Sequence, residues 1–275
     1  MSPLLEVSNL RVTFPTASGP LEVVKGVSFT LGRERLGIVG ESGSGKSMTG
    51  RSILRLIRAP GIAAADRLAF DGIDLMAQSE RQMRGIRGAR ISMVMQDPKF
   101  SLNPVMTIGE QIAEALRTHQ RLSRADLRRR TIAMLEAVRI NDPERVMRLY
   151  PHEVSGGMGQ RVMIAMMLIP EPDLLIADEP TSALDVSVQA QVLEIIDELI
   201  RRKGMGLIFI SHDLNLVSAY CDRILVMRGG EVVDSCAAGQ LQNASHPYTR
   251  GLLAAIPRID ETRDELPVLD RGAMS

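Results

Sequence analysis

The segment "GESGSGKS", from Gly40 to Ser47, has the residue types and spacing of a phosphate-binding loop. A glycine, four further residues and Gly-Lys-Ser stand between the apolar stretch "RLGIV" and a stretch that predicts a helix. Glycines let backbone N–H groups curl around phosphates at a helix N-terminus, where the helix dipole favours anions. Lys46 is expected to reach the β- and γ-phosphates, and Ser47 to hold Mg²⁺. A flexible glycine-rich loop without a ligand is the alternative, which the strand-to-helix context disfavours.

Two adjacent carboxylates, Asp178 and Glu179, follow the apolar stretch "LLIA". The C-terminal ends of strands are where ligands bind in open α/β sheets. Asp178 can support Mg²⁺, and Glu179 can accept a proton from an attacking water. The pair alone is equally compatible with an exposed acidic turn.

A third stretch, "VSGGMGQR" from Val154 to Arg161, places three glycines directly before the apolar run "VMIAMMLI". A glycine inside a helix costs about 1 kcal/mol relative to alanine, so these glycines need a reason. The stretch contains no nucleophile–base pair and no set of metal ligands.

The elements that must position these residues follow from the periodicity of the chain. Alternating stretches at 5–14 and 21–31 predict an antiparallel sheet, 35–40 predicts a strand, and 47–57 predicts a helix. The middle of the chain, about 97–153, is helix-rich. Apolar strands at 174–177 and 206–210 then flank an amphipathic helix at 188–202, and a hairpin turns at Gly229–Gly230. Strands that alternate with helices imply a parallel α/β core, with the helical middle inserted as a lobe.

Composition limits the classes of function. Lysine plus arginine equals aspartate plus glutamate at 33 each, which argues against a nucleic-acid binder. Two cysteines are too few for a disulfide framework. No signal peptide is visible, and the longest apolar run stops at Pro170, too short to span a bilayer. The expected location is therefore cytosolic, and any work at a membrane needs another subunit.

Five further motifs follow the phosphate loop in a fixed order: "MVMQDP" with Gln96, "VSGGMGQ", "LLIADEP", "SALD" at Ser182–Asp185, and "ISHD" with His212. With these motifs the chain resembles the ATPase subunit of ABC transporters along almost its whole length. The resemblance implies an α/β P-loop NTPase (RecA-like) core, with an N-terminal antiparallel β subdomain and an α-helical subdomain inserted at about 97–165. It also implies an ATPase domain over 1–258 and a C-terminal tail over 259–275.

The resemblance also implies roles for individual residues. The residues implied to bind ATP are Phe14, Gly40, Ser42, Gly43, Gly45, Lys46, Ser47, Ser155, Gly156, Gly157 and Asp185. The implied catalytic residues are Glu179, His212 and Gln96, and the implied Mg²⁺ ligands are Ser47, Gln96 and Asp178. Two of these residues have a purely structural alternative. His212 could be a core histidine, and Phe14 could pack in the core instead of stacking on adenine.

In this family the stretch that begins at Ser155 opens a helix and faces the ATP of a second subunit. Bare backbone at Gly156 and Gly157 would then admit the γ-phosphate, and Ser155 would donate a hydroxyl hydrogen bond. The expected partners are polytopic membrane permease subunits, a second homologous ATPase subunit in a heterodimer and, indirectly, an extracytoplasmic substrate-binding protein, with no nucleic acid. The expected location is peripheral, at the cytoplasmic face of the inner or plasma membrane.

A finer resemblance, to importers of dipeptides, oligopeptides and nickel, rests on "SLNP", "YPHEVSGGM", "RVMIAM" and "HPYTRGLL". The chain departs mildly from the family at Val154, where leucine is usual, and at Gly159, where arginine or serine is common. No cysteine follows Cys236, so no iron–sulfur cluster is expected. The rival interpretation is a non-transport ABC ATPase of DNA repair or the ribosome, which the absence of long coiled coils disfavours. A small GTPase is disfavoured further, because the chain lacks an Asn-Lys-x-Asp element.

Overall fold

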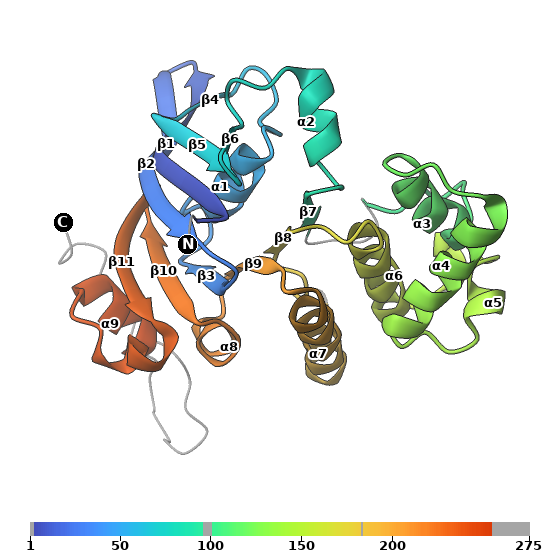
Figure 1. The fold of residues 1–275 in the computed structure, drawn as a ribbon. Helices are drawn as coiled ribbons and strands as arrows, with labels where there is room; N and C mark the ends of the chain where they lie inside the picture. Colours follow the sequence, from blue (N-terminus) through green and yellow to red (C-terminus); the bar gives the residue numbers. More distant parts are fainter. Residues whose placement is uncertain (1–2, 96–100, 183, 255–275) are drawn as a thin grey trace. The chain divides into compact units, whose positions relative to one another are not determined.

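A computed structural model describes residues 3–95, 101–182 and 184–254 of the chain (Figure 1). By its internal contacts the chain forms two compact units, each described here by itself. The first unit contains the residues up to Met76 together with those from Phe209 onward, and the second runs from Ala77 to Ile208. Gln96 and the predicted tail at 259–275 lie outside the described residues. The domain boundaries predicted from the sequence stay predictions.

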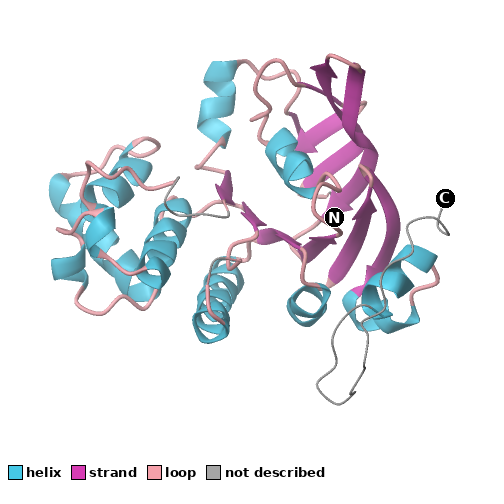
Figure 2. Cartoon of the chain, turned by 180° about the vertical axis from the view of Figure 1, so that it is seen from behind, coloured by secondary structure: helices cyan, strands magenta, loops and turns pink. Residues whose placement is uncertain are grey.

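The first unit contains the predicted N-terminal antiparallel sheet, drawn in magenta in Figure 2. Strands β1 (Leu5–Thr16) and β2 (Gly19–Leu31) pair antiparallel, and β5 (Arg67–Phe70) and β6 (Ile73–Asp74) continue the order β2-β1-β5-β6, with β4 (Ile62–Ala64) paired to β1. A register shift between Val7 and Leu10 keeps the apolar residues of β1 on the buried face although the spacing changes from two to three.

A second set of strands in this unit positions the phosphate loop. Strand β3 (Arg35–Val39) pairs parallel with β10 (Arg223–Arg228), which forms the predicted hairpin with β11 (Glu231–Ala237). The turn residues Gly229 and Gly230 have φ values of 55° and 94°, which glycine adopts without strain. Strand β9 (Gly206–Ser211) follows β3 in the strand order, and its residues from Phe209 onward belong to this unit. The helices of this unit are α1 (Lys46–Ile53), α8 (Leu214–Tyr220), the 3₁₀ helix η3 (Ala238–Asn243) and α9 (Pro247–Ala254).

Helix α1 is shorter than the sequence predicts. It ends at Ile53 rather than near residue 57, because Arg55 takes a left-handed φ of 51° and the Leu56 N–H bonds back to the Arg51 carbonyl. The prediction of a helix to 57 was wrong because an apolar run continues past a turn that closes the helix.

The second unit contains the parallel strands β7 (Ile91–Val94) and β8 (Leu174–Asp178) and the helix-rich middle of the chain. Its helices are α2 (Glu80–Ile86), α3 (Ile108–Arg117), α4 (Arg124–Ala137), α5 (Pro143–Val146), η2 (Pro151–Glu153), α6 (Gly156–Leu168) and α7 (Val186–Lys203). The α-helices all begin after a capping side chain that accepts a hydrogen bond from the N–H three residues later. These caps are Ser79, Thr107, Ser123, Asp142, Ser155 and Asp185.

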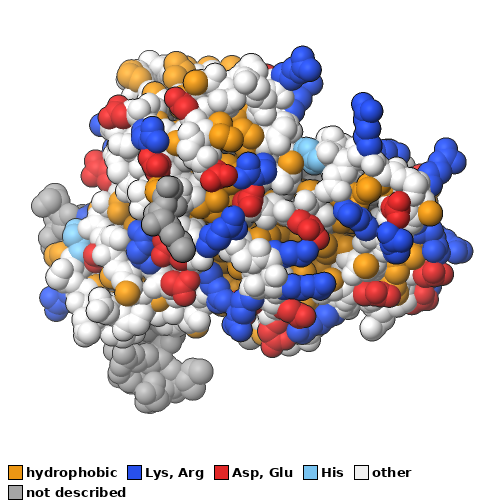
Figure 3. All heavy atoms as spheres, in the orientation of Figure 1, with side chains coloured by type: hydrophobic (Ala, Val, Ile, Leu, Met, Phe, Trp, Pro, Cys, Tyr) orange, Lys and Arg blue, Asp and Glu red, His pale blue; other side chains and the backbone are white. Residues whose placement is uncertain are grey.

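The surface carries charges of both signs. Figure 3 shows Lys or Arg side chains interspersed with Asp and Glu on the visible face. On α4, Arg128 pairs with Glu144 and Arg129 with Asp126, and the exposed arginine run Arg128–Arg130 is a solvated helix face. Within the described part of the chain, no helix combines the length and the apolar character that crossing a bilayer requires.

Candidate nucleotide-binding and hydrolysis site

The loop between β3 and α1 has backbone geometry that needs glycine at three positions, for different reasons. Gly40 has a φ of 153°, and a Cβ there would lie 2.1 Å from the Met227 carbonyl oxygen. Gly45 has a φ of 97°, and a Cβ there would lie 2.6 Å from the Val23 carbonyl oxygen. Gly43 has a φ of 82° but nothing within 4 Å of the added atom, so only its dihedral angle demands glycine. The two ends of the loop therefore pack closely against β10 and β2, whereas no described residue packs against Gly43 in its middle.

Lys46 is buried, with 6% of its surface exposed, at the first position of α1. Its ammonium group donates to the carbonyl oxygens of Gly40, at 2.7 Å, and Glu41, at 2.8 Å. The residue before it, Gly45, is the N-cap and offers no side chain to the first N–H groups, unlike the Ser, Thr and Asp caps of the second unit. The loop thus combines a cation and an uncapped helix N-terminus, which is an arrangement that favours an anion.

The carboxylates after β8 differ in environment. Asp178 is only 3% exposed at the last position of the strand, which excludes the exposed acidic turn for this residue. Glu179 has a φ of 48°, a conformation that costs a non-glycine residue free energy and that clusters at functional sites. Its carbonyl oxygen accepts from the Ser182 N–H at 3.3 Å and the Ser182 hydroxyl at 3.2 Å, which hold the turn. The sequence places both carboxylates, but it gives no sign of this strained backbone.

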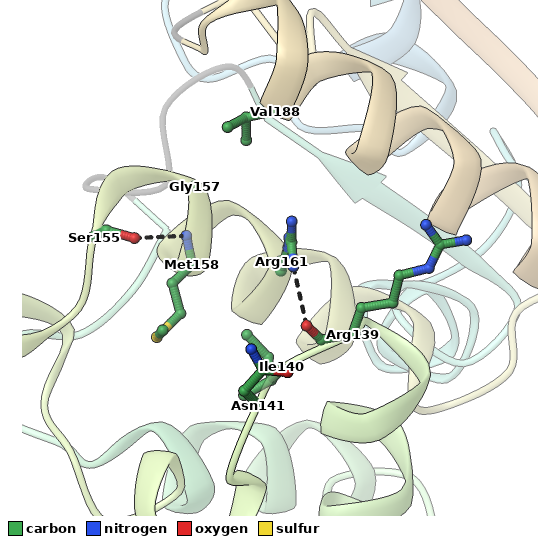
Figure 4. Close-up of a pocket in the computed structure, with 8 residues that line it drawn as sticks. All are labelled: Arg139, Ile140, Asn141, Ser155, Gly157, Met158, Arg161 and Val188. Carbon is green, nitrogen blue, oxygen red and sulfur yellow. Dashed lines mark hydrogen bonds between the residues drawn. The ribbon is translucent and has the colours of Figure 1, made fainter.

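The three glycines of Val154–Arg161 are not equivalent. Ser155 caps α6, since its Oγ accepts from the Met158 N–H at 3.3 Å (Figure 4). A Cβ at Gly156 or at Gly159 would meet nothing within 4 Å, whereas a Cβ at Gly157 would lie 2.9 Å from Cγ1 of Val188 on α7. Among these three glycines, packing against the described residues requires glycine at Gly157 alone, and the same residues do not explain the bare backbone at Gly156.

Helix α6 is tied to the segment that carries Asp178 and Glu179. The Gln160 amide, 1% exposed, donates to the Pro180 carbonyl, and the Arg161 guanidinium donates to Gln191 on α7 and to the Arg139 carbonyl, the latter at 3.0 Å. Sequence reasoning missed these connections. The one available signal was the polar pair Gln160 and Arg161, which directly precedes the apolar run of α6.

A pocket of about 190 Å³ lies beside the first turn of α6 (Figure 4). Ligand pockets usually measure roughly 300–1,000 Å³, so this hollow is too small for a whole nucleotide. The residues that line it are Arg139, Ile140, Asn141, Ser155, Gly157, Met158, Arg161 and Val188.

The other predicted residues have the following environments. Asp185 caps α7, because its Oδ1 accepts from the Ser187 hydroxyl at 2.7 Å and the Val188 N–H at 3.0 Å, which lowers the pKa of the carboxyl. His212 follows β9 and is exposed, so it is not a core histidine. Phe14 is half-buried with its ring against Gly61, where a Cβ would lie 2.5 Å from the ring.

The predicted site residues fall into two sets. The first unit holds Phe14, the loop Gly40–Ser47 and His212, and the second holds Ser155–Gly157, Asp178, Glu179 and Asp185. Gln96, predicted for both catalysis and Mg²⁺, lies outside the described residues. The roles of these residues stay predictions.

Comparison with known proteins adds independent evidence. Residues 24–182 match the ABC transporter family. The chain is 46% identical to the dipeptide transport ATP-binding protein DppD of Bacillus subtilis (strain 168), over 98% of this chain and 82% of that protein. It is 48% identical to a putative peptide import ATP-binding protein of Brucella abortus (strain 2308), over 98% and 81%.

Solved structures agree with the sequence comparisons. The dimeric ATP-binding cassette MJ0796 bound to ADP and Pi superposes with a TM-score of 0.77 at 26% identity, over 85% of this chain and 98% of that one. The cbiO1 subunit from Clostridium perfringens superposes with a TM-score of 0.75 at 25% identity, over 88% and 92%. The chain therefore belongs to the ABC transporter family.

Proposed function

We propose that this chain is the ATP-hydrolysing subunit of an ABC importer, with dipeptides or oligopeptides as the favoured cargo. The observation that carries the proposal is the loop Gly40–Ser47, where a buried Lys46 and an uncapped helix N-terminus converge. The peptide assignment is supported by relatives named for dipeptide and peptide import.

In the proposed reaction Lys46 exchanges its bonds to the Gly40 and Glu41 carbonyls for bonds to the β- and γ-phosphates. Phe14 stacks on the adenine ring. Ser47, Asp178 and Gln96 would hold Mg²⁺, since hydroxyl, carboxylate and amide oxygens are the ligands this hard cation prefers. When bound, Mg²⁺ neutralises charge on the phosphates.

Glu179 then acts as the general base. It accepts a proton from water as the water oxygen bonds to the γ-phosphorus, the bond to the β-phosphate oxygen breaks, and ADP and phosphate leave. His212 contacts the γ-phosphate as charge develops on it. The left-handed backbone at Glu179 is consistent with a residue held for such a role.

The site is completed by a second subunit. Ser155, Gly156, Gly157 and Asp185 face the nucleotide of that subunit, and the described residues leave the space beside Gly156 open. The related cassette that was solved with ADP and Pi is a dimer. We favour a homologous second ATPase, two polytopic permeases at the cytoplasmic face of the membrane, and an extracytoplasmic binding protein that acts indirectly.

The general base is tested by Glu179→Gln in the assembled transporter. We expect intact ATP binding and hydrolysis slower by roughly two to four orders of magnitude, the usual share of acid–base catalysis. Glu171→Gln is a matched control, because Glu171 also has a left-handed backbone, with a φ of 61°, but pairs with Lys203. Turnover at the wild-type rate in Glu179→Gln would refute the assignment.

A further inference from the structure

The C-terminal helix α9 carries a buried tyrosine to which the proposed reaction gives no role. Tyr248, in the stretch "HPYTRGLL", is 2% exposed and is among the largest fully buried side chains of the described chain. Figure 1 draws α9 beside β10 and β11, in the unit that holds the phosphate loop.

The tyrosine hydroxyl contacts the start of that loop. The Glu41 N–H donates to the Tyr248 hydroxyl oxygen at 3.3 Å, although the two residues are 207 positions apart in the chain. The carbonyl of the same Glu41 accepts from the Lys46 ammonium group at 2.8 Å. One backbone residue thus joins Tyr248 to the lysine through two consecutive hydrogen bonds.

Tyr248 and its neighbour Thr249 also contact strands β10 and β11. The Arg228 guanidinium lies over its ring, 5.2 Å from the centroid, and the neighbouring Thr249 hydroxyl donates to Asp234 of β11 at 2.8 Å. The hairpin that carries Arg228 and Asp234 also contacts the loop directly, since the Gly230 N–H donates to the Ser44 carbonyl at 3.1 Å. Helix α9 and the hairpin therefore contact each other, and each donates or accepts a hydrogen bond with the phosphate loop.

We propose that Tyr248 is a positioning residue for the phosphate loop. By fixing the Glu41 backbone, it holds the loop in the conformation from which the Lys46 ammonium group exchanges the Gly40 and Glu41 carbonyls for the phosphates. The inference rests on the proposed function of this loop in ATP binding. Helix α9 thereby contributes to nucleotide affinity without touching the nucleotide.

Tyr248→Phe tests this role because it removes the hydroxyl and keeps the ring over which Arg228 lies. In the full chain we expect ATP to bind about two- to tenfold more weakly, the effect of losing one neutral hydrogen bond. The assembled transporter should show the same increase in KM for ATP while kcat at saturating ATP stays unchanged. Direct titration with ATP measures the affinity, and steady-state hydrolysis measures the split between KM and kcat.

The control is Tyr220→Phe, which removes a hydroxyl from a tyrosine of the same unit whose ring packs on Phe209. It should bind ATP as the wild type does. Unchanged ATP affinity in Tyr248→Phe, an equal loss in Tyr220→Phe, or a fall in kcat without a change in KM would each overturn the inference. Wild-type chain that fails to bind ATP would instead overturn the proposed function.

Discussion

Glycines and cysteines in this chain are distinguished by what lies around each one, not by residue type. Gly156 and Gly157 are adjacent in a proposed binding stretch, yet only Gly157 packs against a side chain of its own chain. Cys221 is buried while Cys236 is half-buried. Such differences decide which substitution tests binding and which tests folding.

Burial raises the pKa of the Cys221 thiol to about 12, and the neighbouring Asp222 adds to this effect. Only the thiolate reacts, so in a Cys236→Ser variant alkylation should accelerate about tenfold for each pH unit up to pH 10 without a plateau. In the unfolded chain the rate of alkylation should level off above about pH 8.5.

The contribution of the buried thiol to the free energy of unfolding is complete below about pH 8.5 and is lost as the pH rises toward 12. A plateau near pH 8.5 in the native protein would show that the thiol is exposed to solvent.

At the scale of elements, helix α8 lies so close to β3 that only glycine fits at Gly37. A Cβ there would lie 2.1 Å from Cγ1 of Val217 and 3.2 Å from the Cys221 sulfur. We expect Gly37→Ala to lower the free energy of unfolding by about 1–3 kcal/mol, the usual cost of overpacking. Urea unfolding measures it. Gly32→Ala is the matched control, because nothing lies within 4 Å of its added atom, and equal effects of the two changes would contradict this packing.

The elements could be predicted where their signal is local. The alternation of β1 and β2, the Gly229–Gly230 turn and the amphipathic pattern of α7 each lie within one short window, and the structure confirms them. The early end of α1 could not be predicted, because the left-handed Arg55 interrupts an apolar run that continues.

The motifs of the site could be predicted from the sequence, but the hydrogen bonds that hold these motifs in place could not. The loop Gly40–Ser47 has a sequence pattern because phosphate binding demands one. By contrast, Gln160 bonds to Pro180, 20 positions away, and Glu41 to Tyr248, 207 positions away. No local pattern encodes such contacts, because they depend on how distant elements pack.

At the scale of the whole molecule, we propose that two chains contribute to each nucleotide site. In this proposal Ser155, Gly156 and Gly157 of this chain complete the site at the partner subunit's phosphate loop, and the partner completes the site at Gly40–Ser47. Variants of this chain can therefore damage either its own site or that of its neighbour.

Mixing two damaged variants tests which partner is used. Lys46→Ala damages the variant's own site, and Gly156→Asp should damage the partner's, since a carboxylate would face the γ-phosphate. If the chain paired with itself, mixed dimers would regain one intact site and some hydrolysis. We expect no recovery, because each assembly would hold one copy of this chain beside a homologous subunit. Recovered activity would contradict the heterodimer.

The most direct test of the shared site compares Gly156→Ala with Gly159→Ala in ATP binding and steady-state hydrolysis. Both changes add one methyl group to α6, and neither methyl group meets an atom of the described residues within 4 Å. A difference between the two variants therefore points to contacts outside the described residues. In the assembled transporter, Gly156→Ala should leave the ATP affinity of its own loop unchanged, but the ATP in the partner subunit's loop should be hydrolysed about a hundredfold more slowly, because a displaced γ-phosphate reacts poorly. Gly159→Ala should hydrolyse ATP at the wild-type rate, and full activity in Gly156→Ala, or equal losses in both variants, would contradict the account.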